Sequence, residues 1–322
     1  MRAIRLTATD PTNPLSGVTI GEGPEPRAPD QWAKVTMKAA SVNAADFAVM
    51  RGAAARSVTP IVLGSDGAGI DDQGNEVIIY PILNESVSHR DPMHDPNLRM
   101  LSQGVDGTFA TALRVPRANL IPKPPQLSWE VAACLGTAWL TAYRMLFIRA
   151  RVLPGETVLV HGAGGGVATA LIQLATTAGI RVWVTARDAV RRQRAVTELG
   201  ADNAFAPDAL LPEPVDAVMD TAGATTLESS LSALRAGGRL VLAGASSGAI
   251  TELDISPIFL RSLSVLGSAM GSPDDLHRLA DFVATREIVP AIDSIWDLDN
   301  GLQALERART GDAFGKVVIR CS

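Results

Sequence analysis

A glycine-rich turn, VLVHGAGGGVATA at Val158–Ala170, is the segment of this sequence best suited to chemistry. Apolar residues precede it and helix-forming residues follow it, so the turn joins a buried strand to a helix. At such a point free backbone N–H groups and the helix dipole attract a pyrophosphate, and glycine lets the backbone approach it closely. We therefore predict a dinucleotide site, although a turn that serves only packing would look the same. The expected contacts are Ala163, Gly164, Gly165, Gly166 and Val167.

The residues after the next strand indicate which dinucleotide is bound. An NAD enzyme usually carries Asp or Glu there, which binds the adenosine ribose. Here Ala186 holds the expected carboxylate position, Arg187 follows it, and Arg191 comes one helical turn later. A guanidinium suits the 2′-phosphate of NADPH in charge and geometry, so Arg187 and Arg191 predict NADPH. Asp188 is the competing acid, but it is better placed to cap the next helix. The alternative for the arginines is a solvated helix face.

Other common reaction centres lack their residues in this sequence. A short-chain dehydrogenase needs a tyrosine with a lysine four residues later, but Asn84 and Phe147 occupy that position after Tyr80 and Tyr143. The four histidines and two cysteines form no cluster with metal-ligand spacing. We therefore predict no metal site.

The composition fits a two-domain enzyme that works in the cytoplasm. The chain has 322 residues and a net charge of −5, which offers no face for nucleic acid or an acidic membrane. No apolar run approaches the roughly 20 residues of a membrane span, and the first residues lack the apolar core of a signal peptide. Two cysteines are too few for a disulfide framework.

Two patterns divide the chain into domains. Short strands at 33–40, 76–80 and 109–115 make the first part β-rich, with Pro and Gly between them. From Gly155 onward strands and helices alternate, which predicts a parallel, doubly wound sheet of the Rossmann type. Amphipathic helices and a last strand at 316–320 follow. We predict a dinucleotide-binding domain at 125–272, inserted in a substrate domain made of 1–124 and 273–322.

A series of short motifs runs through nearly the whole chain. In order, they are ASVNAAD (Ala40–Asp46), VLGSDGAG (Val62–Gly69), GTFA (Gly107–Ala110), LTAY (Leu140–Tyr143), HGAGGGV (His161–Val167), LGAD (Leu199–Asp202), DTAG (Asp220–Gly223) and FGKVVI (Phe314–Ile319). With them the chain resembles the medium-chain dehydrogenase/reductase superfamily, in its zinc-independent quinone oxidoreductase branch. The resemblance implies an α/β fold with a Rossmann sheet inserted in a GroES-like catalytic domain. It also implies a homodimer paired along the sheet of the cofactor domain.

The same resemblance locates the positions at which zinc-dependent relatives carry their metal ligands. Here these positions hold Asn43, Ser65 and Thr137, with Asp66 beside Ser65. Asn, Ser and Thr are poor zinc ligands, so the reaction is expected to proceed without a metal. Without a Lewis acid, the acceptor must delocalise negative charge itself, as a quinone or an α,β-unsaturated carbonyl does. We predict hydride transfer from C4 of NADPH to such an acceptor.

The resemblance also implies roles for single residues. Asn43 is expected to hydrogen-bond the nicotinamide ribose or the substrate carbonyl, and Asp46 and Thr137 are expected to line the same pocket. Asp46 has the alternative role of bracing the Asn43 loop. Further cofactor contacts are implied for Thr141, Thr221, Ala222, Gly244, Ala245, Ser268, Ala269, Met270 and Lys316.

Two other functions stay open at this point, and one departure from the family pattern bears on the cofactor. An enoyl-thioester reductase shares the hydride chemistry, and Tyr80 is the one tyrosine of the N-terminal domain that could act as its acid. A non-catalytic NADPH-binding sensor would need the cofactor site alone. The 206–214 crossover is short and broken by proline, with Pro207 where a tyrosine near the adenine is often found. Adenine packing is therefore expected to differ.

Overall fold

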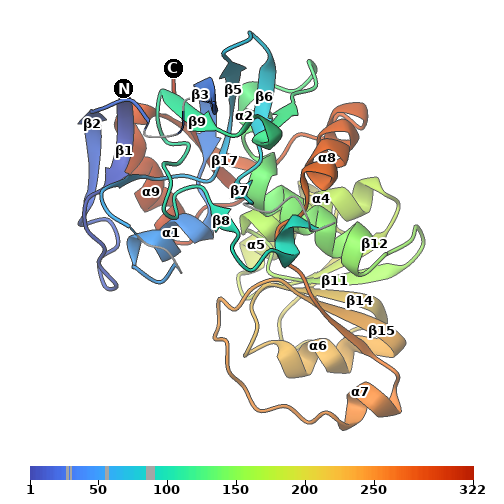
Figure 1. Cartoon of the computed structure of the whole chain (residues 1–322). Coiled ribbons are helices and arrows are strands. Elements are labelled where there is room, and N and C mark those ends of the chain that lie inside the picture. The colour runs from blue at the N-terminus through green and yellow to red at the C-terminus, as the bar shows by residue number, and fades with distance from the viewer. Residues whose placement is uncertain (27–28, 30, 55–57, 85–90) are drawn as a thin grey trace. The chain divides into compact units, whose positions relative to one another are not determined.

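The computed structural model describes residues 1–26, 29, 31–54, 58–84 and 91–322. They form two compact units (Figure 1): Met1–Leu140 with Gly271–Ser322, and Thr141–Met270. The second unit is thus an insertion in the first. The boundaries lie after Leu140 and before Gly271, whereas the sequence pattern predicted them after residue 124 and before residue 273. The segment 125–140 consequently belongs to the first unit.

The first unit is built mainly from antiparallel strands. Its main sheet has the order β10-β6-β5-β3-β18-β17 with β9 also paired to β3, beside a sheet β2-β1-β4 and the pair β7-β8. Alternate side chains of β3 are buried, which is why the AKVTMKAA pattern predicted a strand. The strands are β1 (Arg2–Leu6), β2 (Val18–Glu22), β3 (Ala33–Ser41), β4 (Ile61–Val62), β5 (Asp66–Asp71), β6 (Glu76–Ile79), β7 (Ile82–Leu83), β8 (Arg99–Met100), β9 (Ala112–Val115), β10 (Leu120–Pro122), β17 (Ile292–Asp297) and β18 (Lys316–Arg320).

Four α-helices accompany these strands in the described part of the first unit. They are α1 (Ala44–Met50), α2 (Trp129–Ala132), α8 (Pro273–Thr285) and α9 (Gly301–Arg309). Ser128, a residue type that favours the N-cap position, caps α2 by accepting a hydrogen bond from Val131 N at 3.2 Å. A π-helical turn, Leu135–Trp139, follows α2 and carries Thr137. The polar stretch 84–104 has little periodicity, which is typical of a surface loop; its residues 85–90 lie outside the described residues, and the rest includes β8.

The second unit is a parallel six-stranded sheet in the order β13-β12-β11-β14-β15-β16. This is the doubly wound Rossmann order, so the predicted fold is confirmed. As predicted, no helix lies between β13 and β14, where the prolines of 206–214 interrupt the chain. The strands are β11 (Thr157–His161), β12 (Arg181–Thr185), β13 (Asn203–Phe205), β14 (Val215–Asp220), β15 (Leu234–Leu242) and β16 (Ser264–Gly267). The helices are α3 (Leu140–Tyr143), whose first residue belongs to the first unit, α4 (Gly166–Thr177), α5 (Ala189–Thr197), α6 (Leu227–Ala233) and α7 (Ser256–Leu260).

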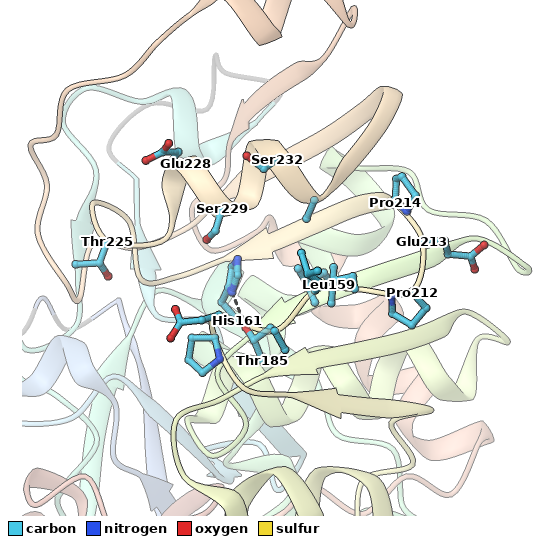
Figure 2. A pocket seen from close by; sticks show the side chains of 16 residues that line it. Leu159, His161, Thr185, Pro212, Glu213, Pro214, Thr225, Glu228, Ser229 and Ser232 are labelled. Carbon is cyan, nitrogen blue, oxygen red and sulfur yellow. Dashed lines mark hydrogen bonds between the residues drawn. The ribbon is translucent and has the colours of Figure 1, made fainter.

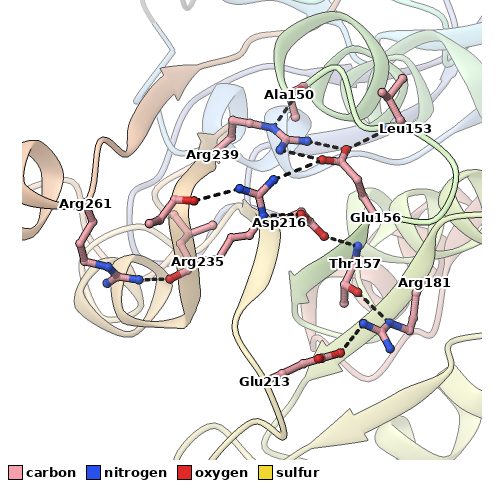
Figure 3. Close-up of polar contacts among 12 residues, drawn as sticks. Ala150, Leu153, Glu156, Thr157, Arg181, Glu213, Asp216, Arg235, Arg239 and Arg261 are labelled. Atoms are coloured by element: carbon pink, nitrogen blue, oxygen red, sulfur yellow. Dashed lines mark hydrogen bonds and ion pairs between the residues drawn. The ribbon is translucent and has the colours of Figure 1, made fainter.

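A network of charged side chains fixes the amino ends of the central strands (Figure 3). Arg239 of β15 binds both carboxylate oxygens of Glu156, at 2.9 and 2.7 Å, and the carbonyl oxygen of Ala150 at 3.0 Å. Arg235 binds Asp216 at 2.6 Å, and Asp216 in turn accepts the N–H of Thr157 at 2.8 Å. These contacts hold β11, β14 and β15 together at the edge opposite to the glycine turn.

Candidate active site

The glycine turn follows β11 directly and leads into α4. Gly162 has φ +92°, a left-handed conformation that a side chain would strain. Gly165 is the N-cap of α4, no side chain caps this helix, and a Cβ on Gly165 would meet no atom within 4 Å. The space beside the first N–H groups of α4 is therefore open, as a phosphate site requires. This geometry fits the predicted pyrophosphate position.

Apart from Thr141, the cofactor contacts predicted in the second unit follow carboxyl ends of strands. Because the strands are parallel, these ends meet at one edge of the sheet, with β11 at the switch point of the strand order. The loops after β14 and β15 are joined, since Ser247 N donates to the carbonyl oxygen of Ala222 at 2.8 Å. A Cβ on Gly244 would come within 2.6 Å of the carbonyl oxygen of Thr221. The residues are Ala163–Val167 after β11, Arg187 and Arg191 after β12, Thr221 and Ala222 after β14, Gly244 and Ala245 after β15, and Ser268–Met270 after β16.

Thr141 lies in α3 and not after a strand, yet it joins this group. Its hydroxyl lies 3.9 Å from the sulfur of Met270. The structure thus brings the predicted residues of the second unit to one edge, and their contact with a dinucleotide stays a prediction.

The three arginines after β12 have different environments. Arg191 lies over the glycine turn, because a Cβ on Gly164 would stand 3.2 Å from its guanidinium. Arg192 donates to the carbonyl oxygens of Ala186 and Arg187, at 2.6 and 2.8 Å, and so holds the loop that carries Arg187. Arg187 itself is exposed. Asp188 accepts the N–H of Arg191 at 2.7 Å and caps α5, as predicted. The competing acid is therefore engaged in a helix cap.

His161 is a structural link at the start of the turn. Its Nδ1 lies 2.7 Å from Thr185 Oγ1 and its Nε2 2.9 Å from Ser230 Oγ. Ser230 donates its own proton to Asp220 Oδ2 at 2.9 Å, so Nε2 must carry the histidine proton and Nδ1 must accept from Thr185. Burial lowers the pKa of His161, and this effect outweighs the negative charge of Asp220, which raises it. A neutral His161 thus ties β11 to β12 and α6 at the carboxyl edge.

The described part of the second unit also contains a pocket of about 640 Å³ (Figure 2). Leu159, His161 and Thr185 contribute from the sheet, α6 contributes Glu228, Ser229 and Ser232, and the 207–214 loop lines the other side. The pocket lies where the crossover between β13 and β14 lacks a helix. Pro207, which was expected near the adenine, is one of its lining residues.

In the first unit, Lys316, Asn43, Asp66, Ser65 and Thr137 form one hydrogen-bonded cluster. The ammonium of Lys316 donates to Asn43 Oδ1 at 2.6 Å, to Val42 O at 2.9 Å and to Asp66 Oδ2 at 3.3 Å. Asn43 Nδ2 donates to Ser65 Oγ at 3.3 Å, and Ser65 Oγ lies 3.3 Å from Thr137 Oγ1. Asn43 and Thr137, both predicted as catalytic, are therefore linked through Ser65.

Asp46 braces the Asn43 loop. Its Oδ2 accepts the N–H of Asn43 at 2.8 Å, which closes a capping box at the start of α1. The side chain is only 1% exposed. Burial raises the pKa of Asp46 to about 7, the N–H of Asn43 lowers it, and the charge of Asp66 raises it further. Of the two roles considered for Asp46, the contacts favour the brace over a place in the pocket lining.

Tyr80, the tyrosine that an enoyl reductase would use as an acid, is buried. Its hydroxyl donates to the carbonyl oxygen of Gly271 at 2.7 Å within the same unit. Its proton is therefore engaged with the backbone.

The sequence alone did not reveal the partners of Lys316. It was expected to contact the cofactor, but each of its three protons is taken by an acceptor in the Asn43 cluster. Contact with the dinucleotide stays a prediction, and these bonds leave no ammonium proton for it. One signal was present: Lys316 begins the apolar strand KVVIR, and Asp66 begins the apolar strand DGAGID. Charges of opposite sign in buried strands need each other.

Comparisons with known proteins identify the family. A family model described as "Alcohol dehydrogenase GroES-like domain" matches residues 29–125, and one described as "Zinc-binding dehydrogenase" matches residues 166–285. A zinc-type alcohol dehydrogenase-like protein of Schizosaccharomyces pombe is 30% identical over 89% of this chain and 90% of its own length. The chain therefore belongs to the medium-chain dehydrogenase/reductase superfamily and is an oxidoreductase of that family.

Other relatives differ in the substrates that their names state. A probable quinone oxidoreductase of Schizosaccharomyces pombe is 29% identical over 67% of this chain and 70% of its own length. A crotonyl-CoA reductase of Streptomyces avermitilis is 26% identical over 80% of this chain and 67% of its own length. This chain is also similar to a crystal structure titled NAD-dependent alcohol dehydrogenase. The superposition covers 100% of both chains, with 32% sequence identity and a TM-score of 0.89.

The zinc named in these descriptions does not fit the residues of this chain. The positions where the resemblance places its ligands carry an amide and two hydroxyls, and the Lys316 ammonium is bonded to that amide at 2.6 Å. The Lys316 ammonium would repel a zinc ion at this position. It also occupies the amide oxygen of Asn43, which such an ion would need as a ligand. Among the residues that the structure describes, no three His, Cys, Asp or Glu side chains form a group that could hold a metal ion.

Proposed function

We propose that this chain is an NADPH-dependent, zinc-independent reductase of quinones or α,β-unsaturated carbonyls. The observation that carries the proposal is the hydrogen-bonded cluster around the buried ammonium of Lys316, which includes the three residues at the positions where the resemblance places metal ligands. When bound, the dinucleotide would provide a hydride at C4 of its nicotinamide, and one proton from solvent would complete the reduction of the acceptor. An acceptor that delocalises the resulting negative charge needs hydrogen bonds and not a metal.

The chain's own residues perform two tasks in this proposal. The carboxyl edge of the second unit holds the dinucleotide, with the pyrophosphate at the start of α4 and the 2′-phosphate near Arg187 and Arg191. Asn43 and Thr137 of the first unit offer hydrogen bonds to the acceptor oxygen or the nicotinamide ribose. Correct mutual orientation of donor and acceptor then supplies much of the rate.

The cofactor choice is tested with variants of the arginines. Arg187→Ala and Arg191→Ala should each raise the dissociation constant for NADPH about 10- to 100-fold, because each removes a charged partner of the 2′-phosphate. The constant for NADH should stay nearly unchanged. Arg194→Ala is the matched control, because Arg194 lies on the same helix but pairs with Glu198 at 2.7 Å. Equal losses for NADH and NADPH would refute the assignment of these arginines to the 2′-phosphate.

The acceptor is tested by following NADPH absorbance with a panel of quinones, enones and crotonyl-CoA. Oxidation with a quinone or an enone supports the proposal. Reduction of crotonyl-CoA alone would favour the second candidate, an enoyl-thioester reductase, which the similarity to crotonyl-CoA reductase over 80% of the chain makes equally tenable. NADPH binding without oxidation of any member would instead indicate a sensor. Zinc found in stoichiometric amount in the active protein would contradict the metal-free mechanism.

A homodimer is part of the proposal. Strand β16 is an edge of the six-stranded sheet, and the neighbouring Ile255, Phe259, Leu260 and Val265 are exposed apolar side chains. Pairing of two β16 edges would cover them. Sedimentation velocity should give twice the chain mass of 33.8 kDa, and a monomer at micromolar concentration would refute this.

The setting proposed for this chemistry is the reducing cytoplasm, which the two free, buried cysteines support. Separately, none of the helices in the described part of the chain has the length and apolarity needed to cross a membrane.

A further inference from the structure

The side chain of Lys316 is a cation enclosed in the first unit. It is 2% exposed and begins β18, between strands β3 and β17 of the main sheet. Its shortest hydrogen bond, 2.6 Å, goes to Asn43 Oδ1, whereas the carboxylate of Asp66 lies 3.3 Å away. A buried ammonium is tolerated only when its protons are taken by acceptors. Here the amide oxygen of Asn43 takes the closest of them.

The position of the ammonium determines how the Asn43 amide is oriented. A proton donated to Oδ1 requires the oxygen to point to Lys316, so the NH₂ group must point the other way. There it donates to Ser65 Oγ at 3.3 Å, and it lies 3.4 Å from Ser41 O. The positive charge also draws electron density toward Oδ1, which makes the NH₂ group a stronger donor.

The hydrogen bonds lead from the enclosed cation to the surface of the unit. Ser65 is buried, and its hydroxyl lies 3.3 Å from that of Thr137, which is partly exposed. Because Ser65 accepts from Asn43, its own proton is available for Thr137. The direction is therefore fixed from Lys316 through Asn43 to Ser65, and the Ser65–Thr137 hydroxyl pair, in which either oxygen can donate, continues the line to the partly exposed end.

Asp66 balances the charge without lying on this line. Its Oδ2 accepts from Lys316 and from Ser41 Oγ at 3.1 Å, and its Oδ1 is buried against Gly136. Oδ1 has no hydrogen-bond partner among the described residues. Removal of Lys316 alone would leave this carboxylate buried and unpaired, which is costly. A test of Lys316 must therefore neutralise Asp66 in the same variant.

We propose that Lys316 is a positioning residue for the acceptor, whose ammonium replaces a metal as the fixed positive charge and orients the Asn43–Ser65–Thr137 donors. The proposal rests on the proposed reductase function, because it assigns these donors to the acceptor oxygen. The charge acts through the amide and the hydroxyls, and Lys316 itself does not touch the acceptor.

The experiment compares two double variants that each remove a buried lysine and its acidic partner from the first unit; the partner Asp66 is buried and the partner Glu76 is exposed. Lys316→Met with Asp66→Asn removes the charge behind Asn43. The control, Lys123→Met with Glu76→Gln, removes a second buried lysine whose ammonium lies 2.7 Å from Glu76. We expect the first variant to lower kcat about 10- to 100-fold with the KM for NADPH unchanged, and the control to change kcat less than about threefold. An equal loss in both would show that Lys316 contributes only to folding stability.

A second readout does not depend on turnover. Selective ¹⁵N-asparagine labelling gives the side-chain amide signal of Asn43, assigned by its loss in Asn43→Asp. In the Lys316→Met/Asp66→Asn variant this signal should shift and its protons should exchange with solvent at least about tenfold faster. An unchanged signal would overturn the positioning role. If the signal changes but the wild-type protein oxidises NADPH with no acceptor of the panel, the reductase function fails while the orientation of Asn43 by Lys316 stands.

Discussion

Replacing Asp46 with asparagine should make the protein more stable at high pH. The carboxyl is enclosed at the start of α1, and burial raises its pKa to about 7 from 3.8. A carboxyl whose pKa rises on folding stabilises the fold while it is protonated. This contribution is complete below about pH 4 and is lost as the pH rises through about 7. The asparagine side chain in the Asp46→Asn variant keeps an oxygen that can accept the N–H of Asn43, and it cannot ionise.

The size of the effect follows from the two pKa values. Ionisation of the unfolded chain disfavours folding by roughly 1.7 kcal/mol at pH 5 and by roughly 4 kcal/mol at pH 8. The wild-type protein should therefore lose roughly 2.5 kcal/mol relative to Asp46→Asn between these pH values. At pH 5 the folded carboxyl is still protonated, so the variant and the wild type should be much closer in stability.

The assay is urea unfolding at pH 5, 6, 7 and 8, with the two proteins compared at each pH so that all other titrating groups cancel. Asp293→Asn is the control in the same unit. The hydrogen bond from Arg307 lowers the pKa of Asp293, so this carboxyl is ionised throughout the range and its variant should differ from the wild type by a constant amount. A difference between Asp46→Asn and the wild type that stays level from pH 5 to pH 8 would refute the reasoning, because Asp46 would then be ionised in the folded protein at pH 5.

Three further predictions concern other parts of the molecule. Gly165→Ala should leave the melting temperature unchanged, since a Cβ there meets open space, but the Cβ should hold the phosphates away and weaken NADPH binding at least about tenfold. Unchanged binding in a titration would show that the phosphates bind elsewhere. Arg239→Met should lower the free energy of unfolding, measured with urea, by about 2 kcal/mol, because it leaves the mostly buried Glu156 without its bidentate partner. Arg194→Met breaks an exposed pair and should lower it by less than about 0.5 kcal/mol. Burial raises the pKa of both Cys134 and Cys321 to about 12, so neither thiol should react with a thiol reagent at pH 8 until urea is added. Fast labelling of the native protein would contradict this, because it would show that the thiols are accessible.

The second unit was largely predictable because its pattern is local. Strand, turn and helix alternate from Thr157 onward, and the glycines and the Asp188 cap mark the ends of elements. Parallel strands then bring all their carboxyl ends to one edge, so residues as distant as Gly164 and Ala245 could be assigned to one site. The loop conformations were not predictable: that Arg191 lies over Gly164 depends on how α5 packs.

The first unit was less predictable because its contacts join distant segments. Strands such as β1 and β5 are short or rich in glycine and lack a clear alternation of apolar and polar residues. Asn43 and Thr137 were identified through the resemblance, but Lys316 lies 273 residues from Asn43 in the sequence. No local pattern predicts such a pair. The buried lysine and the buried acid were each visible as charges in apolar strands, and only the fold shows that they meet.

The chemistry of the Lys316 cluster bears on the proposed class of acceptor. A carboxylate buried as fully as Asp66 needs a nearby cation, and either a metal or an ammonium can meet that need. A metal also forms a bond to the substrate oxygen, so it can stabilise an alkoxide whose charge stays on one atom. An ammonium whose protons are all engaged can act only through the hydrogen bonds of its neighbours. In the proposed function, hydrogen bonds from Asn43 and Thr137 suffice where the product anion spreads its charge over a ring or an enolate, which is why we propose quinones and enones over simple aldehydes and ketones.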